Sequence, residues 1–283
     1  MSRLLAANFT RLRKNKLFYL CLGFMIFLAV TLPISQAHQI AELNQQRGTE
    51  YETVLDQQYF IFVMFIGLVA SVFCGMFLGT EYSDGTVRNK IVVGHKRTSV
   101  YLANLITCAS ASLMMCIVFI AVYLAVGYPL LGGFHSEIKQ ILLLSIAGLM
   151  TAVSFASIFT LISAISQNKA AIAVSCILFA FVSMFAGQII ENKLEAPEFY
   201  SGYTYTDDKG QVVEQPSEKN PNYLEGTKRE IYEFLHDFLP GDQQQQIGTM
   251  KAEKPWLLTA YSATLIVMTT GAGLYIFRRK KLK

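Results

Sequence analysis

Charged residues are scarce in this sequence and are nearly missing from its long apolar runs. Only 16% of the 283 residues are Asp, Glu, Lys or Arg, whereas 53% are hydrophobic. Lys139, at the edge of the fourth run, is the only Asp, Glu, Lys, Arg or His in six runs near 17–36, 58–79, 100–126, 139–165, 170–190 and 256–276. Proton- and ion-coupled carriers generally need ionisable groups at membrane depth. The scarcity therefore argues against a secondary transporter.

Motifs of catalysis are missing as well. The sequence has no Gly-x-x-x-x-Gly-Lys-Ser/Thr loop, so it cannot cradle nucleotide phosphates in the P-loop manner. Its four histidines are scattered without metal-ligand spacing, and no Ser-His-Asp pattern indicates a protease. We therefore predict neither catalytic nor metal-binding residues, and we expect no nucleic-acid partner.

Cysteine is present but is confined to the apolar runs. None of the five cysteines falls in a segment outside those runs. We therefore expect no disulfide bonds.

The apolar runs predict six transmembrane helices. About 20 helical residues cross a hydrocarbon core of about 30 Å, and each run is at least that long. The runs are continuously apolar rather than alternating, and open strands would leave backbone groups unpaired in lipid. The predicted fold class is therefore an all-α, multi-pass membrane protein.

The distribution of basic residues predicts cytoplasmic N- and C-termini. With the N-terminus inside, the inner pieces hold 15 basic residues and two acidic residues, whereas the outer pieces hold 9 basic and 18 acidic residues. Cytoplasmic loops carry such an excess of Lys and Arg. We therefore divide the chain into a membrane domain at 1–190, an extracytoplasmic insert at 191–255, and a sixth span with a basic tail at 256–283.

The segments between the spans predict further elements. Residues 3–16 place Leu4, Leu5, Phe9 and Leu12 on one face and basic residues on the other, which favours an interfacial helix over a frayed basic tail. Loop 37–57 is expected to be helical extensions joined at Arg47-Gly48, and 127–133 a turn.

A charged island at 79–99 separates the second and third spans. Ser83 or Asp84 is expected to cap a short helix, Gly94 to end it, and Thr98 or Ser99 to cap the next helix. Val87, Ile91 and, less regularly, Val92 fall on one side at helical spacing. The segment is therefore an amphipathic helix that can dock on a protein or lipid. An ordinary basic loop that only sets orientation is the alternative.

The island resembles one element of a known family. Permeases of the ATP-binding-cassette type 2 exporter family carry an E-x-x-x-G-T-x-R…G-x-x-R pattern at this place, matched here by Glu81, Gly85, Thr86, Arg88, Gly94 and Arg97. The resemblance implies that 80–97 holds a coupling helix seated in a cleft of a separate ATPase subunit. The residues implied to couple to it are Glu81, Tyr82, Gly85, Thr86, Arg88, Asn89, Gly94 and Arg97. Glu81 and Arg88 would lie on roughly one side of this helix if it begins early, and Glu81 would otherwise lie just ahead of it.

The same resemblance implies a function and its partners. The chain would be the permease of an exporter in a bacterial cell membrane, without enzyme activity of its own. ATP and magnesium would be bound by the partner ATPase, and a second copy or a related permease would complete the pair within membrane lipid. Six-span members often resemble transporters that export, or protect against, bacteriocins and similar peptides. The alternative is a membrane receptor or assembly protein whose insert is a binding module.

Two stretches within the spans indicate close helix packing. Gly67, Ser71, Gly75 and Gly79 recur every four residues and form a small-residue strip, with ordinary packing and transmission of motion as open alternatives. The fourth span is rich in Ser, Thr, Gly and Ala. Helix packing explains this composition better than a cavity lining does.

The insert predicts a small α/β unit. Strand-forming residues alternate across 203–213, which indicates a hairpin. The run 223–239 is then a helix stopped by Pro240-Gly241. Its apolar face consists of Ile231, Phe234, Leu235 and Phe238. We expect this helix to seal the exit, with contact to the cargo as the alternative.

Overall fold

Six long helices form the body of the protein. The computed structural model describes residues 1–48, 54–206 and 212–280. Within them, six helical stretches are long and apolar enough to cross a membrane, which confirms the six predicted spans. They are α2 (Lys16–Arg47), α3 with α4 (Asp56–Tyr59 and Ile61–Ser83), α6 (Arg97–Leu131), α7 (Ile138–Ile165), α8 (Lys169–Leu194) and α11 (Pro255–Arg279).

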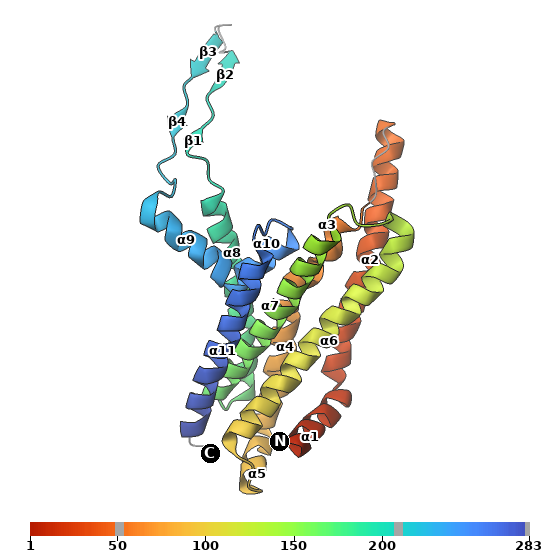
Figure 1. Cartoon of the computed structure of the whole chain (residues 1–283), viewed down its shortest axis with the longest axis vertical. Coiled ribbons are helices and arrows are strands. Elements are labelled where there is room, and N and C mark those ends of the chain that lie inside the picture. Colours follow the sequence, from red (N-terminus) through yellow and green to blue (C-terminus); the bar gives the residue numbers. More distant parts are fainter. Residues whose placement is uncertain (49–53, 207–211, 281–283) are drawn as a thin grey trace.

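The helices α4 and α7 occupy the centre of the bundle. The helix α4 packs against α6, α7 and α8, whereas α7 packs against α4, α6 and α11. The helix α2 stands at one side and packs mainly on α6 (Figure 1). Ser, Thr and Ala side chains of α7 are buried among these neighbours, and many of the hydroxyls bond carbonyls of their own helix. The small residues of α7 are thus packing residues, as expected.

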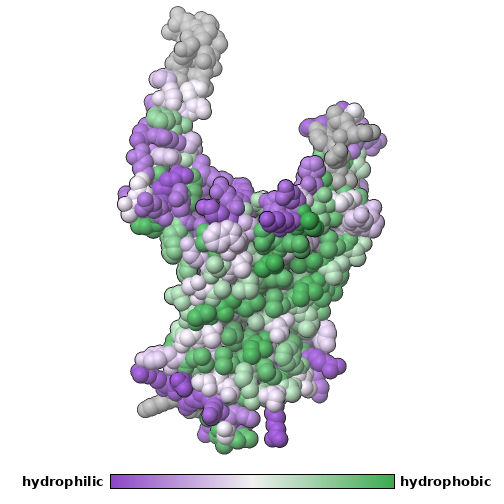
Figure 2. Space-filling model, in the orientation of Figure 1, coloured by the Kyte–Doolittle hydropathy of each residue, from purple (hydrophilic) through white to green (hydrophobic). Residues whose placement is uncertain are grey.

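The two ends of the bundle differ in what they carry. Both termini lie with the short helix α5 (Thr86–Val92) at one end, which we call the basic end (Figure 1). The strands of the insert project from the other end, which we call the insert end. Figure 2 shows hydrophilic residues gathered at both ends and a hydrophobic band between them. This distribution fits a bundle whose middle lies in lipid.

The structure tests three expectations about the segments between the spans and changes one of them. The helix α2 runs on to Arg47, and Gly48 ends it with a φ of 62°, so the expected helical extension is confirmed there. The expected turn at 127–133 is wrong in its first part, because α6 continues through Pro129 to Leu131. A proline in a last turn removes only one hydrogen bond from the helix. The N-terminal helix α1 (Ser2–Arg13) is present, packed on α6.

The insert contains the expected hairpin and helix, together with one unexpected helix. Strand β2 (Tyr203–Thr206) pairs antiparallel with β3 (Val212–Gln215), and β1 (Phe199–Tyr200) pairs with β4 (Glu218–Lys219). The predicted turn of the hairpin lies outside the described residues. The helix α9 (Gly226–Phe238) is followed at once by α10 (Pro240–Gly248). Pro240 therefore starts a helix as well as ending one, since its fixed φ suits a first helical position.

Candidate coupling site at the basic end

The helix α5 is set off by two glycines. Gly85 precedes it with a φ of 66°, and Gly94 follows it with a φ of 98°. Few side chains tolerate these backbone angles. The predicted end at Gly94 is confirmed, but the predicted caps are wrong, because neither α5 nor α6 has a side-chain cap. The hydroxyl of Ser83 instead donates to the carbonyl of Thr80, at 3.1 Å, and so completes the end of α4.

The helix α5 has one buried side and one free side. Val87 is 2% exposed and belongs to an apolar cluster at the basic end, and Ile91 packs against that cluster. Arg88 and Asn89 are exposed, and Val92 is 77% exposed. Val87 and Ile91 thus share one side, as their spacing predicts, and that side packs within this chain, whereas Val92 belongs to the free side. The helix itself lies at the tip of the basic end (Figure 1).

Beneath α5, a buried carboxylate joins four helices. The side chain of Glu81 is fully buried. Arg11 of α1 lies 2.6 Å from its Oε1, and Lys90 of α5 forms an ion pair with the same atom. Asn104 of α6 donates to Oε2 at 2.6 Å. Two cations and an amide thus surround one anion, which offsets the cost of removing these charges from water.

A second layer of contacts fixes this Glu81 cluster, which consists of Asn8, Arg11, Glu81, Lys90 and Asn104. The Asn8 amide donates to Asn104 at 2.8 Å and accepts from Lys90 at 2.8 Å. The Arg11 guanidinium lies 3.6 Å from the ring centroid of Phe77 and donates to the Phe77 carbonyl at 3.0 Å. Burial lowers the pKa of Arg11, and the Glu81 charge opposes that effect.

The resemblance-derived coupling residues divide into outer and inner groups. Gly85 separates α4 from α5, so Glu81 lies ahead of α5, which is the second of the two expected arrangements: Glu81 is buried in α4 and Arg88 is exposed on α5. Tyr82 is partly buried, with the Lys280 amine 5.1 Å from its ring centroid. Thr86 begins α5 and is partly buried. Arg97 donates to carbonyls at the end of α11, including that of Phe277 at 3.3 Å.

The small-residue strip packs α4 on α8. A Cβ at Gly75 would lie 3.0 Å from the Cα of Ala173, and one at Gly79 would lie 3.1 Å from the Lys169 carbonyl oxygen. Gly67 faces Gln244 of α10, and Ser71 is buried. The strip is therefore a contact within this subunit. Whether it also transmits motion stays a prediction.

The apolar face of α9 is half buried at the insert end. Phe234 and Phe238 stack at 5.2 Å between centroids, and both rings meet Tyr261 of α11 edge-on. Ile231 remains 52% exposed, and Leu235 is partly buried. The helix is thus held to α11 by an aromatic trio, Phe234, Phe238 and Tyr261.

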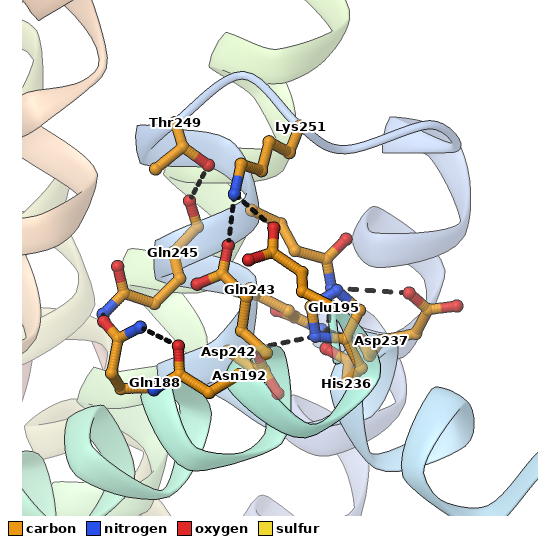
Figure 3. A network of polar contacts seen from close by, with 12 residues as sticks. Gln188, Asn192, Glu195, His236, Asp237, Asp242, Gln243, Gln245, Thr249 and Lys251 are labelled. Carbon is orange, nitrogen blue, oxygen red and sulfur yellow. Dashed lines mark hydrogen bonds and ion pairs between the residues drawn. The ribbon is translucent and has the colours of Figure 1, made fainter. Parts of the chain in front are cut away.

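The helix α10 is a buried polar element that sequence reasoning missed. Its residues 240–247 are all buried. The side chains of Gln243 to Gln246 form hydrogen bonds with several other helices, and their partners include Ser262 of α11, Val63 of α4, Gln188 of α8 and His236 of α9. Figure 3 shows side chains of this network converging from several helices. Four consecutive glutamines indicate an exposed loop by composition, and no local signal distinguishes the buried case.

The partners of Glu81 were also missed, but they had a weak signal. Asn104 is a lone amide within the apolar run 100–126, and Asn8 lies among the apolar residues of the N-terminal helix. A polar side chain among apolar neighbours needs a hydrogen-bond partner when it is buried. That rule points to a polar contact without naming Glu81.

Comparison with known proteins identifies the family. A search of curated proteins found no match. The model of the family described as ABC-2 family transporter protein matches residues 4–187, from α1 to near the end of α8. This range includes α5 and the whole Glu81 cluster, and with six apolar helices it makes the chain a multi-pass membrane protein, consistent with a bacterial cell membrane. The chain belongs to the ABC-2 family of transporter proteins and is a transmembrane component.

Proposed function

We propose that this chain is the permease subunit of an ATP-driven exporter and that α5 is its contact with a separate ATPase subunit. The observation that carries the proposal is the junction of a free helical surface with a buried charge cluster. Arg88, Asn89 and Val92 offer a mixed basic and apolar surface. Directly behind it, Lys90 joins α5 to Glu81.

This arrangement provides a path for force. A push on α5 acts through Lys90 on α4, through Glu81 on α1, and through Asn104 on α6. Packed side chains and ion pairs deform little, so such a push moves elements as units. The helix α4 then carries the displacement along its glycine contacts to α8 and to α10. In this proposal Arg88 docks the ATPase, whereas Lys90 transmits its movement.

The proposal also includes the orientation of the subunit in the membrane, its partner subunits and its cargo. The basic end faces the cytoplasm, where the ATPase binds ATP and magnesium, and the insert lies outside. A second permease, either another copy or a related chain, completes the transporter. The cargo is an amphipathic or peptide-like molecule, because apolar groups such as Ile231 and Phe234 are half exposed beside the polar insert. Export of, or immunity to, antimicrobial peptides is the corresponding biological role.

The experiment is purification of the chain with its ATPase, followed by measurement of ATP hydrolysis in vesicles. The wild-type chain is expected to bind the ATPase and stimulate it. Arg88→Glu should weaken binding more than tenfold, because a charge is reversed at the interface. Lys90→Met should retain binding but lose stimulation. Lys228→Glu reverses a charge at the insert end and is the matched control, expected to change neither property.

Two outcomes would overturn this function. One is an ATPase that never copurifies with the chain or hydrolyses ATP at the same rate without it. That result would favour a receptor or assembly protein. The other is an Arg88→Glu variant that binds and stimulates normally, which would remove α5 from the interface.

A further inference from the structure

A wholly apolar groove opens on the surface between α2 and α4. Its volume is about 400 Å³, and only apolar side chains and Cys21 line it. The wall from α2 runs from Leu17 to Phe24, and the wall from α4 runs from Phe65 to Val72. The helix α2 packs mainly on α6 and touches α4 less. Because α2 packs less closely on α4, the groove remains between the two helices.

The groove belongs to one half of the membrane. Its α2 wall starts at the second residue of that helix, at the basic end. Each wall runs over eight residues of helix, whose seven rises cover about 10 Å. Phe24 and Phe65 meet edge-on at 6.0 Å at the far end of both walls. Half of a hydrocarbon core measures about 15 Å, so the groove ends within the leaflet at the basic end.

Three basic residues come immediately before the α2 wall of the groove in the sequence. Arg13, Lys14 and Lys16 are exposed, and none forms an ion pair with a described residue. Lys16 precedes the lining residues Leu20 and Phe24 by four and eight positions, so all three lie along one side of α2. The first acidic residue of the sequence is Glu42. No acidic residue close in the sequence therefore neutralises these three basic side chains.

Further features at this corner suit an anionic group at the membrane surface. The α2 helix begins here, where Asn15 accepts from the Phe18 N–H at 3.1 Å and caps it, and the helix dipole favours a nearby anion. Tyr19 is 55% exposed and donates its hydroxyl to the Arg13 carbonyl at 3.0 Å. Tyrosine is enriched at the level of lipid headgroups.

We propose that this groove is a binding site for an anionic phospholipid of the leaflet at the basic end. One acyl chain lies between α2 and α4, and the phosphate lies against Arg13, Lys14 and Lys16. An uncharged occupant would leave the basic corner unused, and a headgroup of net negative charge is complementary to it. The lipid would fix the corner between α1 and α2, directly after Arg11 of the Glu81 cluster. This proposal does not depend on the presence of an ATPase.

The test is fluorescence quenching by brominated lipids in the full-length protein. Trp256 is the single tryptophan, so a Trp256→Phe variant has no tryptophan fluorescence of its own. Leu20→Trp places a reporter in the groove, and Val267→Trp places a control on the exposed side of α11. The probes are phosphatidylglycerol and phosphatidylcholine with the same brominated acyl chains. We expect phosphatidylglycerol to quench Trp at position 20 at more than tenfold lower mole fraction, with no such preference at position 267.

A charge variant completes the test. Arg13→Gln, Lys14→Gln and Lys16→Gln together should abolish the preference at position 20, since each basic residue contributes about fivefold to binding of an anionic surface. Equal quenching by both lipids at position 20, in the protein that keeps all three basic residues, would overturn the proposal. Absence of quenching by either lipid would also overturn it, because a second protein chain or a cargo molecule would then cover the groove. Both tryptophan variants change exposed side chains, so folding is expected to be retained.

Discussion

The Arg11 guanidinium lies 2.6 Å from the Glu81 carboxylate, and so joins the N-terminal helix to the end of α4. The two residues are 70 positions apart, and Lys90 reaches the same carboxylate from α5. The short α5 helix, seven residues long, is marginal by itself because isolated helices of this length do not persist in water. Its position therefore depends on Val87 packing and on this buried ion pair.

We predict that Glu81→Gln destabilises the protein strongly. The change leaves two partly buried cations, Arg11 and Lys90, without their buried anion, and breaking a buried pair costs about 3–5 kcal/mol. Thermal unfolding in detergent should show a large decrease in Tm. Arg88→Gln, an exposed change on the neighbouring α5, should remain within about 0.5 kcal/mol of wild type. Equal Tm values for the two variants would contradict the structural role of Glu81.

We predict that Gly75→Leu disrupts packing between α4 and α8. A Cβ at Gly75 already approaches the Cα of Ala173 to 3.0 Å, and overpacking of this kind costs about 1–3 kcal/mol or more. Gly271→Leu on α11 is the control, because its Cβ would meet nothing within 4 Å. Gly127 is unsuitable as a control, since its Cβ would lie 2.7 Å from Leu55.

The measurement is the yield of monodisperse protein together with Tm. Gly75→Leu should lower both, and Gly271→Leu should lower neither. If Gly271→Leu has the larger effect, an unseen contact on α11 matters more than the α4–α8 interface.

Local patterns predicted those features that depend on local physics. Apolar length indicated the six spans, and the need for a positive φ singled out Gly94. The spacing of Val87 and Ile91 indicated the buried side of α5. The capping residues failed because Gly85 supplies the start of α5 through its backbone angle, and Ser83 bonds back to α4. Several local solutions to a helix end compete, and composition does not select among them.

Features that depend on long-range contact were not predictable. The Glu81 cluster joins residues 8, 11, 81, 90 and 104, which meet only after α1 packs on α6. The helix α10 is polar yet buried, because its glutamines bond to backbone and side-chain groups of neighbouring helices. A polar sequence predicts exposure unless its partners are known. The small-residue strip lay between these cases, since its pattern indicated a contact but not that α8 was the partner.

We predict that the insert docks more tightly in mild acid than in mild base. Burial lowers the pKa of His236, but its bond with Asp242 and the nearby acidic charges raise that pKa by more, so it stands above its ordinary value. Burial raises the pKa of Asp242, and His236 opposes this. Both folded groups therefore hold protons more tightly than the unfolded chain does. The histidine contribution is complete below about pH 6.5 and is lost as the pH rises through the folded pKa.

The measurement is Tm at about pH 6 and about pH 8.5. Wild type should lose stability across this interval, and His236→Gln should lose less, because glutamine can bond Asp242 without titrating. His135→Gln, at an exposed histidine, should keep the wild-type dependence. A His236→Gln variant with the full wild-type loss would assign the pH dependence to other groups.

The aromatic trio of Phe234, Phe238 and Tyr261 supports a last prediction about α9. Phe234→Ala with Phe238→Ala removes both rings that hold α9 to α11, and each aromatic pair contributes about 0.5–1.5 kcal/mol beyond its buried area. If α9 seals the exit, the double variant should raise basal ATP hydrolysis or leak while the range of exported cargo stays the same. We expect this result, because the rings pack on this chain's own Tyr261. Lys228→Ala, which removes an exposed polar side chain from the same helix, is the control and should leave basal hydrolysis unchanged. A changed cargo range with unchanged basal hydrolysis would instead place cargo on the α9 face, since rings that bind cargo select it without closing the path.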